Sequence, residues 1–118
     1  MLLRLDPASD VPLFAQVASS VRADAAAGRL KPGDRLPSAR DVAAALGVNL
    51  HTVLRAYQEL RDEGLVDMRR GRGAVVTDAA APLADLRDDV IALTERARAL
   101  GLSSDMLAAL VKETARDR

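Results

Sequence analysis

The apolar residues near the start of the chain recur every four positions, the spacing of an α-helix with one buried face. Asp10 precedes this stripe and is expected to cap the first helical amides, while Pro12 suits the first turn because its missing N–H costs nothing there. The pattern predicts a first helix that ends at Gly28. Its inner face is formed by Leu13, Val17, Val21 and Ala25.

A helix-turn-helix is predicted next. Residues 28–37 contain two prolines and two glycines, which forbid a regular helix and indicate turns with a short extended piece. Ser38 opens a sequence that resembles a capping box, and the short helix behind it is stopped by Gly47. Asn49 repeats this device for a third helix, which Gly64 ends. Two short helices so close together have the spacing of a helix-turn-helix.

A small β-hairpin follows the third helix. Residues 65–68 and 74–77 are predicted strands, and the arginines and glycines of residues 69–73 indicate a tight basic turn between them. A helix-turn-helix followed by such a hairpin is a winged helix. We therefore predict a mainly α fold with a small β-hairpin, in which residues 1–78 form a winged helix-turn-helix domain.

The remaining residues, 79–118, are predicted to form a two-helix tail. Residues 78–82 break the pattern, apolar residues at helical spacing then begin at Leu83, and Ser103 or Ser104 caps a last helix. Two helices of about 15 residues cannot bury a core alone. Their apolar stripes must therefore pack on another surface, and a second copy of the chain is favoured over the first domain.

The composition is that of one globular domain with a small appendage, which excludes a large multi-domain enzyme. The 118 residues are 49% apolar and 29% charged, and no apolar run approaches the roughly 20 residues of a membrane span, so no membrane partner is expected. The amino terminus lacks the apolar stretch of a signal peptide and there is no cysteine, which favours a cytoplasmic location. Because 17 basic residues balance 17 acidic ones, only local clustering can indicate a polyanionic partner.

The sequence lacks the residue sets that catalysis commonly uses. There is no cysteine, His51 is the single histidine, and no glycine-rich phosphate loop follows a buried strand. A metal at His51 would need carboxylates as its other protein ligands, which is uncommon for transition metals. We predict a non-enzyme without cofactor or metal.

Basic residues do cluster locally, at the predicted hairpin. Arg69, Arg70 and Arg72 can meet phosphates or a narrow minor groove there, although Arg69 lies at the strand end, and the glycines allow a close approach. The third helix is short enough to enter the roughly 12 Å major groove and exposes Arg55 for a phosphate contact. Ser38 can also touch a phosphate. These features predict DNA binding; the alternative is a solvated arginine-rich hairpin beside a structural helix pair.

One ordered series of motifs runs through residues 12–76. It consists of Pro12-Leu13-Phe14-Ala15-Gln16-Val17, Gly28-Arg29-Leu30-Lys31-Pro32-Gly33-Asp34-Arg35-Leu36-Pro37-Ser38-Ala39-Arg40, Leu46-Gly47-Val48-Asn49, Thr52-Val53, Arg55-Ala56-Tyr57, Leu60, Glu63-Gly64-Leu65-Val66 and Arg70-Gly71-Arg72-Gly73. Over this stretch the chain resembles the DNA-binding domain of GntR-family bacterial transcription regulators. The short segment behind it resembles the YtrA subfamily, which implies a two-helix dimerisation tail in place of a large effector-binding domain.

The resemblance also implies which residues contact DNA. Arg40 on the second helix is one of them. Leu50 stands where many family members have arginine or proline, so it can only contact a thymine methyl group or pack locally. The other implied contacts lie at the start of the third helix and at the hairpin turn: Asn49, His51, Thr52, Gly71 and Arg72.

Simpler roles stay open for several of these residues. Tyr57 shares the helix face of Val53 and Leu60, so it is expected in the core rather than at a base. Two arginines can form surface ion pairs instead of binding DNA, Arg40 with Asp34 or Asp41 and Arg55 with Glu59. Ser38 and Asn49 can serve as helix caps alone.

The hypothesis drawn from the sequence is a homodimeric transcription repressor that joins two winged domains through residues 83–118 and binds a palindromic operator. A small-molecule effector that releases the DNA is compatible with it. The rival hypothesis assigns the winged helix to protein contact and the tail to a scaffold or an antitoxin-like complex. That rival predicts weak, salt-sensitive DNA binding without a preferred sequence.

Overall fold

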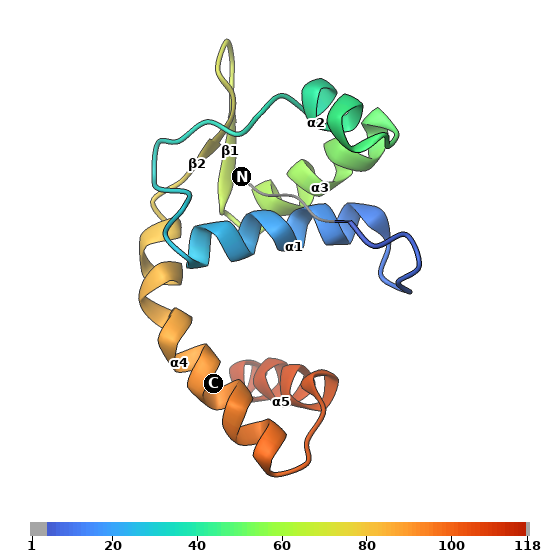
Figure 1. Ribbon diagram of the computed structural model, residues 1–118. Coiled ribbons are helices and arrows are strands. Elements are labelled where there is room, and N and C mark those ends of the chain that lie inside the picture. Colours follow the sequence, from blue (N-terminus) through green and yellow to red (C-terminus); the bar gives the residue numbers. More distant parts are fainter. Residues whose placement is uncertain (1–4, 118) are drawn as a thin grey trace. The chain divides into compact units, whose positions relative to one another are not determined.

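The computed structural model describes residues 5–117, and the chain divides into two compact units between Asp85 and Leu86. The first unit holds three helices and a two-stranded antiparallel sheet, and the second holds most of α4 together with α5 (Figure 1). The elements are α1 (Leu13–Ala26), α2 (Ala39–Leu46), α3 (Leu50–Asp62), β1 (Val66–Arg69), β2 (Gly73–Val76), α4 (Ala80–Ala99) and α5 (Ser104–Arg116). The expected fold class, mainly α with a small hairpin, is confirmed.

The start of α1 differs from the prediction that Asp10 caps it. Pro12 occupies the N-cap position, and no side chain caps the helix. Asp10 lies two residues before that position, out of reach of the first-turn amides. Instead, the Gln16 side chain holds the preceding turn: its Oε1 accepts from the Asp6 amide at 2.7 Å, and its Nε2 donates to the carbonyls of Asp6 at 3.0 Å and Val11 at 2.9 Å.

The caps of α2 and α3 agree with the sequence prediction. The Ser38 hydroxyl accepts from the amide of Asp41 at 3.1 Å, and Asn49 Oδ1 accepts from the amide of His51 at 2.8 Å. Gly47 ends α2 with a φ of 67°, a left-handed conformation that glycine adopts without strain. The two helices are therefore separated by the short turn of a helix-turn-helix.

The hairpin of β1 and β2 gains a third, irregular partner. The two strands pair in antiparallel register, with Val66 opposite Val76 and Arg69 opposite Gly73. On the other side of β2, the Leu36 amide donates to the carbonyl oxygen of Ala74 at 2.9 Å. The glycine- and proline-rich connector thus contains the extended piece predicted for it, because its backbone pairs with the wing.

The core of the first unit is built on the inner face of α3. This helix packs against α1 and α2 and also touches β1. Val53, Ala56 and Leu60 are completely buried, and Tyr57 is 2% exposed, as its position on the same face predicts. The Tyr57 hydroxyl donates to the Pro37 carbonyl at 2.7 Å, so the core side of α3 is tied to the connector that leads into α2.

The fourth helix begins earlier than predicted. Residues 78–82 were expected to break the helical pattern, but α4 starts at Ala80 and contains Pro82 in its first turn. A proline is tolerated there because first-turn amides have no partner within the helix. Ala80 is 2% exposed and belongs to the core of the winged domain, and Leu83 packs against that core. The predicted boundary between residues 78 and 79 therefore falls before residues that pack with the first unit.

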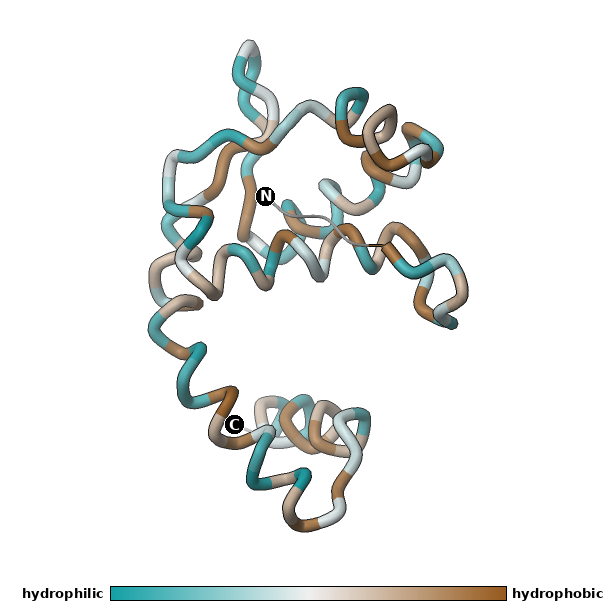
Figure 2. The backbone as a smooth tube through the Cα atoms, viewed as in Figure 1, coloured by the Kyte–Doolittle hydropathy of each residue, from teal (hydrophilic) through white to brown (hydrophobic). Residues whose placement is uncertain are grey.

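The second unit pairs the remainder of α4 with α5. Gly101 separates the helices with a φ of 80°, and Ser103, one of the two predicted caps, accepts from the Met106 amide at 3.1 Å. Apolar residues are interspersed with polar ones along both helices (brown and teal in Figure 2). Many of them are exposed by more than a third of their surface: Leu86, Val90, Ile91, Leu93, Leu100, Leu102, Met106, Leu110 and Val111.

None of the helices within residues 5–117 has an apolar run long enough to cross a membrane.

Burial raises the pKa of Tyr57 from 10.0 to about 12. Unfolding returns the pKa to its ordinary value, so the folded state gains from the protonated hydroxyl below pH 10 and loses that contribution as the pH rises through about 12. Since Tyr57 is the only tyrosine of the chain, its ionisation can be followed alone by ultraviolet absorbance. We expect the folded protein to ionise well above pH 10 and the urea-unfolded chain to ionise near pH 10. Equal midpoints would contradict the buried hydroxyl.

Candidate nucleic-acid interface

The first turn of α2 presents two of the residues predicted to contact DNA. Ser38 is exposed, and its oxygen is used as an acceptor by the Asp41 amide, which leaves the hydroxyl proton free to be donated. Arg40 is exposed as well. In the part of the chain that the structure describes, it forms no ion pair with Asp34 or Asp41. The guanidinium of Arg40 is therefore not engaged by either of these carboxylates.

The start of α3 presents three more of the residues predicted to contact DNA. Asn49 caps the helix through its side-chain oxygen, so its amide nitrogen keeps both N–H donors for a ligand. His51 is exposed, and Thr52 is half-buried. The amino end of a helix also carries the positive end of the helix dipole, which favours an approaching phosphate. Capping and ligand binding are therefore compatible at this position.

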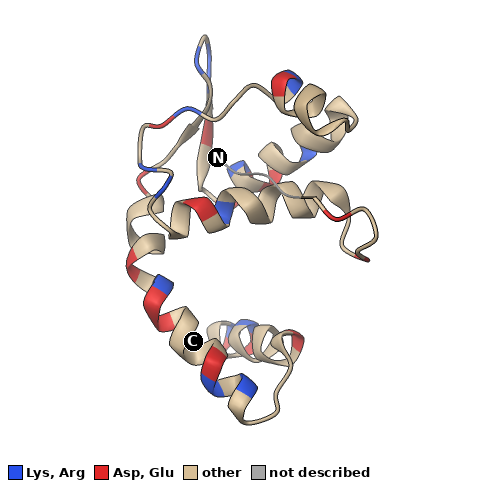
Figure 3. Cartoon of the chain, viewed as in Figure 1, with Lys and Arg blue, Asp and Glu red and all other residues tan. Residues whose placement is uncertain are grey.

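The wing tip is a glycine-rich turn that carries exposed arginines. The strands are connected by Arg70, Gly71 and Arg72. The Arg72 amide closes this turn by donating to the carbonyl oxygen of Arg69 at 3.0 Å. Gly71 has a φ of 79°, in the left-handed region that favours glycine. In Figure 3 the basic tip of this hairpin and the start of α2 both lie at the top of the winged domain. The guanidinium groups of the wing are thus available for an anionic partner.

Arg35 is a residue of this region that the sequence reasoning missed. It forms a bridge with Val75 of β2, and its Nε donates to the Arg72 carbonyl at 3.1 Å. The connector therefore holds the turn of the wing from outside the hairpin. No local periodicity could have indicated this role, because it depends on pairing between segments 37 residues apart.

A groove joins the start of α2 to the wing. Its volume is about 340 Å³, and residues of the connector, α3 and the hairpin line it. Ser38 lines this groove together with Gly71 and Arg72. The structure therefore brings these predicted contacts from α2 and the wing to one surface.

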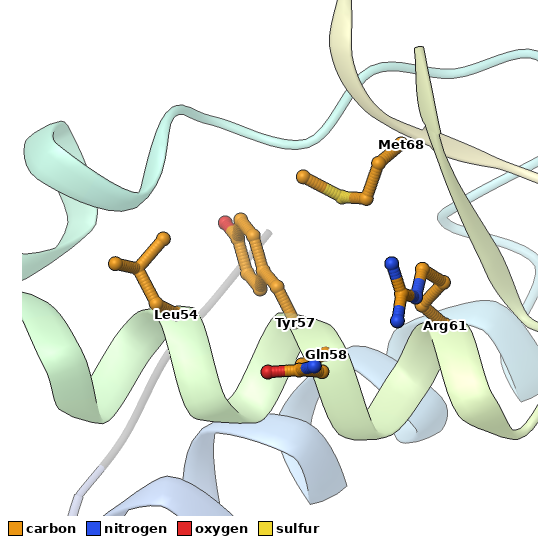
Figure 4. Close-up of a pocket in the computed structure, with 5 residues that line it drawn as sticks. All are labelled: Leu54, Tyr57, Gln58, Arg61 and Met68. Atoms are coloured by element: carbon orange, nitrogen blue, oxygen red, sulfur yellow. The ribbon is translucent and has the colours of Figure 1, made fainter.

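A second groove, of about 320 Å³, lies between α3 and β1 (Figure 4). It shares three lining residues with the first groove, namely Leu54, Tyr57 and Met68, and adds Gln58 and Arg61. The outward side of α3 is thus continuous with the wing through a surface that is partly apolar.

Arg55 does not make the ion pair with Glu59 that the sequence left open. Its guanidinium carbon lies 3.7 Å from the centre of the Phe14 ring, a cation–π contact with α1. Instead, Glu59 Oε2 lies 3.5 Å from Nη2 of Arg22 in α1. Arg55 stays exposed, so the contact with Phe14 orients its charge without removing it from solvent.

The back of α3 is held to α1 by an ion pair. Arg22 Nη2 lies 2.6 Å from Glu63 Oε2, and Arg22 Nε donates to the other oxygen at 2.7 Å. This bidentate contact lowers the pKa of Glu63 and raises that of Arg22. Because the groups sit on the side of α3 that faces α1, they fix the helix without occupying the candidate interface.

Two further residues, Arg69 and Leu50, take structural roles. Arg69 lies at the end of β1, and its Nε is 3.6 Å from Asp67 of the same strand. Leu50 is half-buried and packs against the core of the winged domain. Of the two roles expected for Leu50, local packing is therefore the one that the structure shows.

Across residues 5–117 no group of three or more histidine, cysteine, aspartate or glutamate residues is arranged to hold a metal ion.

The sequence of the winged domain matches a known family. Residues 13–76 fit the profile of the bacterial regulatory proteins of the gntR family, which covers more than half of the chain. The chain belongs to the GntR family. Its winged domain is the DNA-binding domain of GntR-type transcription regulators, and the resemblance inferred from the ordered motifs is confirmed.

Two relatives extend the comparison. The chain is 37% identical over 79 residues to the HTH-type transcriptional repressor YtrA of Bacillus subtilis, a match that covers 67% of this chain and 61% of YtrA. It is 41% identical over 106 residues to the HTH-type transcriptional regulator Rv1152 of Mycobacterium tuberculosis, which covers 86% and 84% of the two chains. Both relatives are transcription regulators, in agreement with the prediction that the chain is not an enzyme.

Solved structures agree with this assignment. YtrA from Sulfolobus acidocaldarius, a GntR-family transcription factor, is 36% identical, with a TM-score of 0.63 over 84% of this chain and 99% of that one. The DNA-binding domain of AraR in complex with its operator ORX1 is 27% identical, with a TM-score of 0.56 over 64% of this chain and 93% of that one. The YtrA-like winged helix-turn-helix is therefore shown by both sequence and fold.

Replacing Arg35 with alanine should loosen the wing. Loss of the bond to the Arg72 carbonyl costs about 1 kcal/mol, so we expect the turn amides to exchange with solvent roughly fivefold faster. Hydrogen exchange measured by NMR checks this. Arg69→Ala is the matched control, because the Arg69 side chain pairs with Asp67 of its own strand and its removal should leave the turn unchanged. The same exchange rates in both variants would show that Arg35 does not hold the wing.

Proposed function

We propose that this GntR-family protein is a homodimeric transcription repressor. Each winged domain contacts one half of a palindromic operator, with the start of α3 in the major groove and the wing against phosphates or the minor groove. A protein that acts on an operator works in the cytoplasm of the bacterium. The proposed contact residues are Ser38, Arg40, Asn49, His51, Thr52, Arg55, Arg70, Gly71 and Arg72.

The observation that carries this proposal is the groove between α2 and the wing. Ser38 and Arg72 both line it, although they come from segments far apart in the sequence. The residues that line it include hydroxyl and guanidinium donors, and these are groups that bind phosphate oxygens and base edges. The operator complex of the AraR domain, a structural relative, supports DNA as the partner of this surface.

The homodimer rests on the apolar surface of the second unit. A groove of about 410 Å³ between α4 and α5 is lined by Leu93, Leu107, Leu110, Val111, Thr114 and Ala115. Leu93, Leu110 and Val111 are each about half exposed there, and such exposed clusters mark association surfaces. A second copy of residues 83–118 would cover this surface and hold two winged domains at a fixed distance.

Repression and effector control complete the proposal. YtrA of Bacillus subtilis is a repressor, and its likeness to this chain favours the same direction of control here. An effector would be small and apolar and would compete with the second copy of the chain for the apolar groove between α4 and α5. Binding there would alter the dimer surface and thereby the spacing of the two winged domains.

The experiment that tests the proposal is selection of bound sequences from a random duplex pool at about 150 mM salt, where non-specific phosphate binding is weak. An enriched inverted repeat supports both operator binding and a twofold dimer. No enrichment would favour the rival hypothesis, in which the winged helix contacts a protein.

Arg40→Ala should weaken operator binding by about 1–3 kcal/mol and relax the preference at one base pair of each half-site, because the donors of one guanidinium are lost. Arg72→Ala should weaken all sequences alike and reduce the slope of log K against log salt by about 1. Fluorescence anisotropy with matched and mismatched duplexes measures both. Lys112→Ala, which removes one positive charge in the second unit, serves as the control that keeps the parent affinity. A parent-like Arg40→Ala would remove Arg40 from the contact set.

Leu110→Glu should convert the dimer to a monomer, because it buries a charge in the apolar face of α5. The winged domain should keep its unfolding transition, since Leu110 lies in the other unit. Sedimentation equilibrium measures the mass. The control is Lys112→Glu, which changes charge on the same helix at an exposed position that does not line the groove. A dimer that survives Leu110→Glu would place the association surface elsewhere.

A further inference from the structure

We propose that Leu54 is a specificity-determining residue that contacts the methyl group of one thymine in each operator half-site. The inference rests on the proposed function, because it assumes that α3 enters the major groove of an operator. It assigns a base preference to a residue that is absent from the contact set derived from the sequence.

Leu54 is an exposed apolar side chain on the outward side of α3. It is 41% exposed and lines both grooves of the winged domain. In Figure 4, Leu54 and Tyr57 rise from α3 on the same side, and Met68 points from β1 toward Tyr57. Met68 is itself 46% exposed. Together they form an apolar patch between the helix and the wing.

The rim of this patch is polar and basic. Ser38 and Arg72 border it in the first groove, and Gln58 and Arg61 border it in the second. These side chains are donors that suit phosphates and base edges, so a duplex seated on them also covers Leu54. The charges of the rim favour a nucleic acid over an apolar protein segment as the occupant.

Thymine supplies the group that Leu54 can bind. A leucine side chain has no hydrogen-bonding atom, and the C5-methyl group of thymine is the apolar group that base pairs present in the major groove. Burying the methyl against Leu54 removes apolar surface of both molecules from water. A cytosine or uracil at the same position lacks this methyl and leaves Leu54 facing a polar base edge.

Neighbouring apolar residues do not serve this purpose. Leu50 packs against the core. Tyr57 is 2% exposed, and its hydroxyl is engaged by Pro37. Met68 belongs to β1 and not to the helix that enters the groove. Among the apolar α3 side chains in this patch, Leu54 is therefore the one that exposes apolar surface to a ligand.

The test uses the duplex that the selection enriches, in which each thymine is replaced in turn by deoxyuridine. Uracil keeps every hydrogen-bonding group of thymine and lacks only the methyl. At one position in each half-site, the parent dimer should bind the uracil duplex about fourfold more weakly per half-site, the effect of one buried methyl group. At that position Leu54→Ala should bind both duplexes equally, and Leu54→Met should retain the difference.

Met68→Ala is the matched control, since it removes an apolar side chain of the same patch with similar exposure and should keep the uracil effect. The inference is overturned if the parent binds every uracil duplex as tightly as the thymine duplex, or if Leu54→Ala retains the difference. A Leu54→Ala protein that is monomeric without DNA would overturn it too, because a second copy would then cover the patch. If the selection enriches no sequence, it is the proposed function that fails. That outcome is distinct from a failure of the Leu54 inference, which requires an enriched operator to be tested.

Discussion

The burial of one face of α3 sets the position of the candidate interface. Val53, Ala56 and Leu60 are completely covered, so the helix cannot rotate without exposing them to water. Tyr57 adds a directional bond to Pro37, and the Arg22–Glu63 pair holds the other side of the helix. With these contacts in place, the amino end of α3 and its outward side remain for a ligand.

The wing is placed by a second set of contacts, which the connector between α1 and α2 makes. The connector pairs with β2 through the Leu36 amide, and Arg35 holds the Arg72 carbonyl. As a result, the donors of the wing and of α2 are supported by groups that need not move when a ligand binds. A site whose residues are held in this way gives up little conformational entropy on binding.

Local interactions explain what the sequence by itself determined. The caps at Ser38 and Asn49 and the stop at Gly47 each involve residues within a few positions of one another, and all three lie where the pattern predicts. The buried face of α3 and the two strands of the hairpin follow from periodicity in the same way. The ordered motifs of residues 12–76 then add the family, because their order and spacing are properties of the sequence.

Only the tertiary structure decided the contacts between segments far apart in the chain. The Gln16 side chain holds the turn before α1 while no side chain caps the helix, Arg55 stacks on Phe14, and Arg35 bonds to the wing. In each case several partners were available to the side chain, and packing selected one by bringing it within reach. The same holds for the start of α4, where burial of Ala80 in the core outweighed the signal of a nearby proline. Periodicity records which face of an element is buried, but it does not record what that face meets.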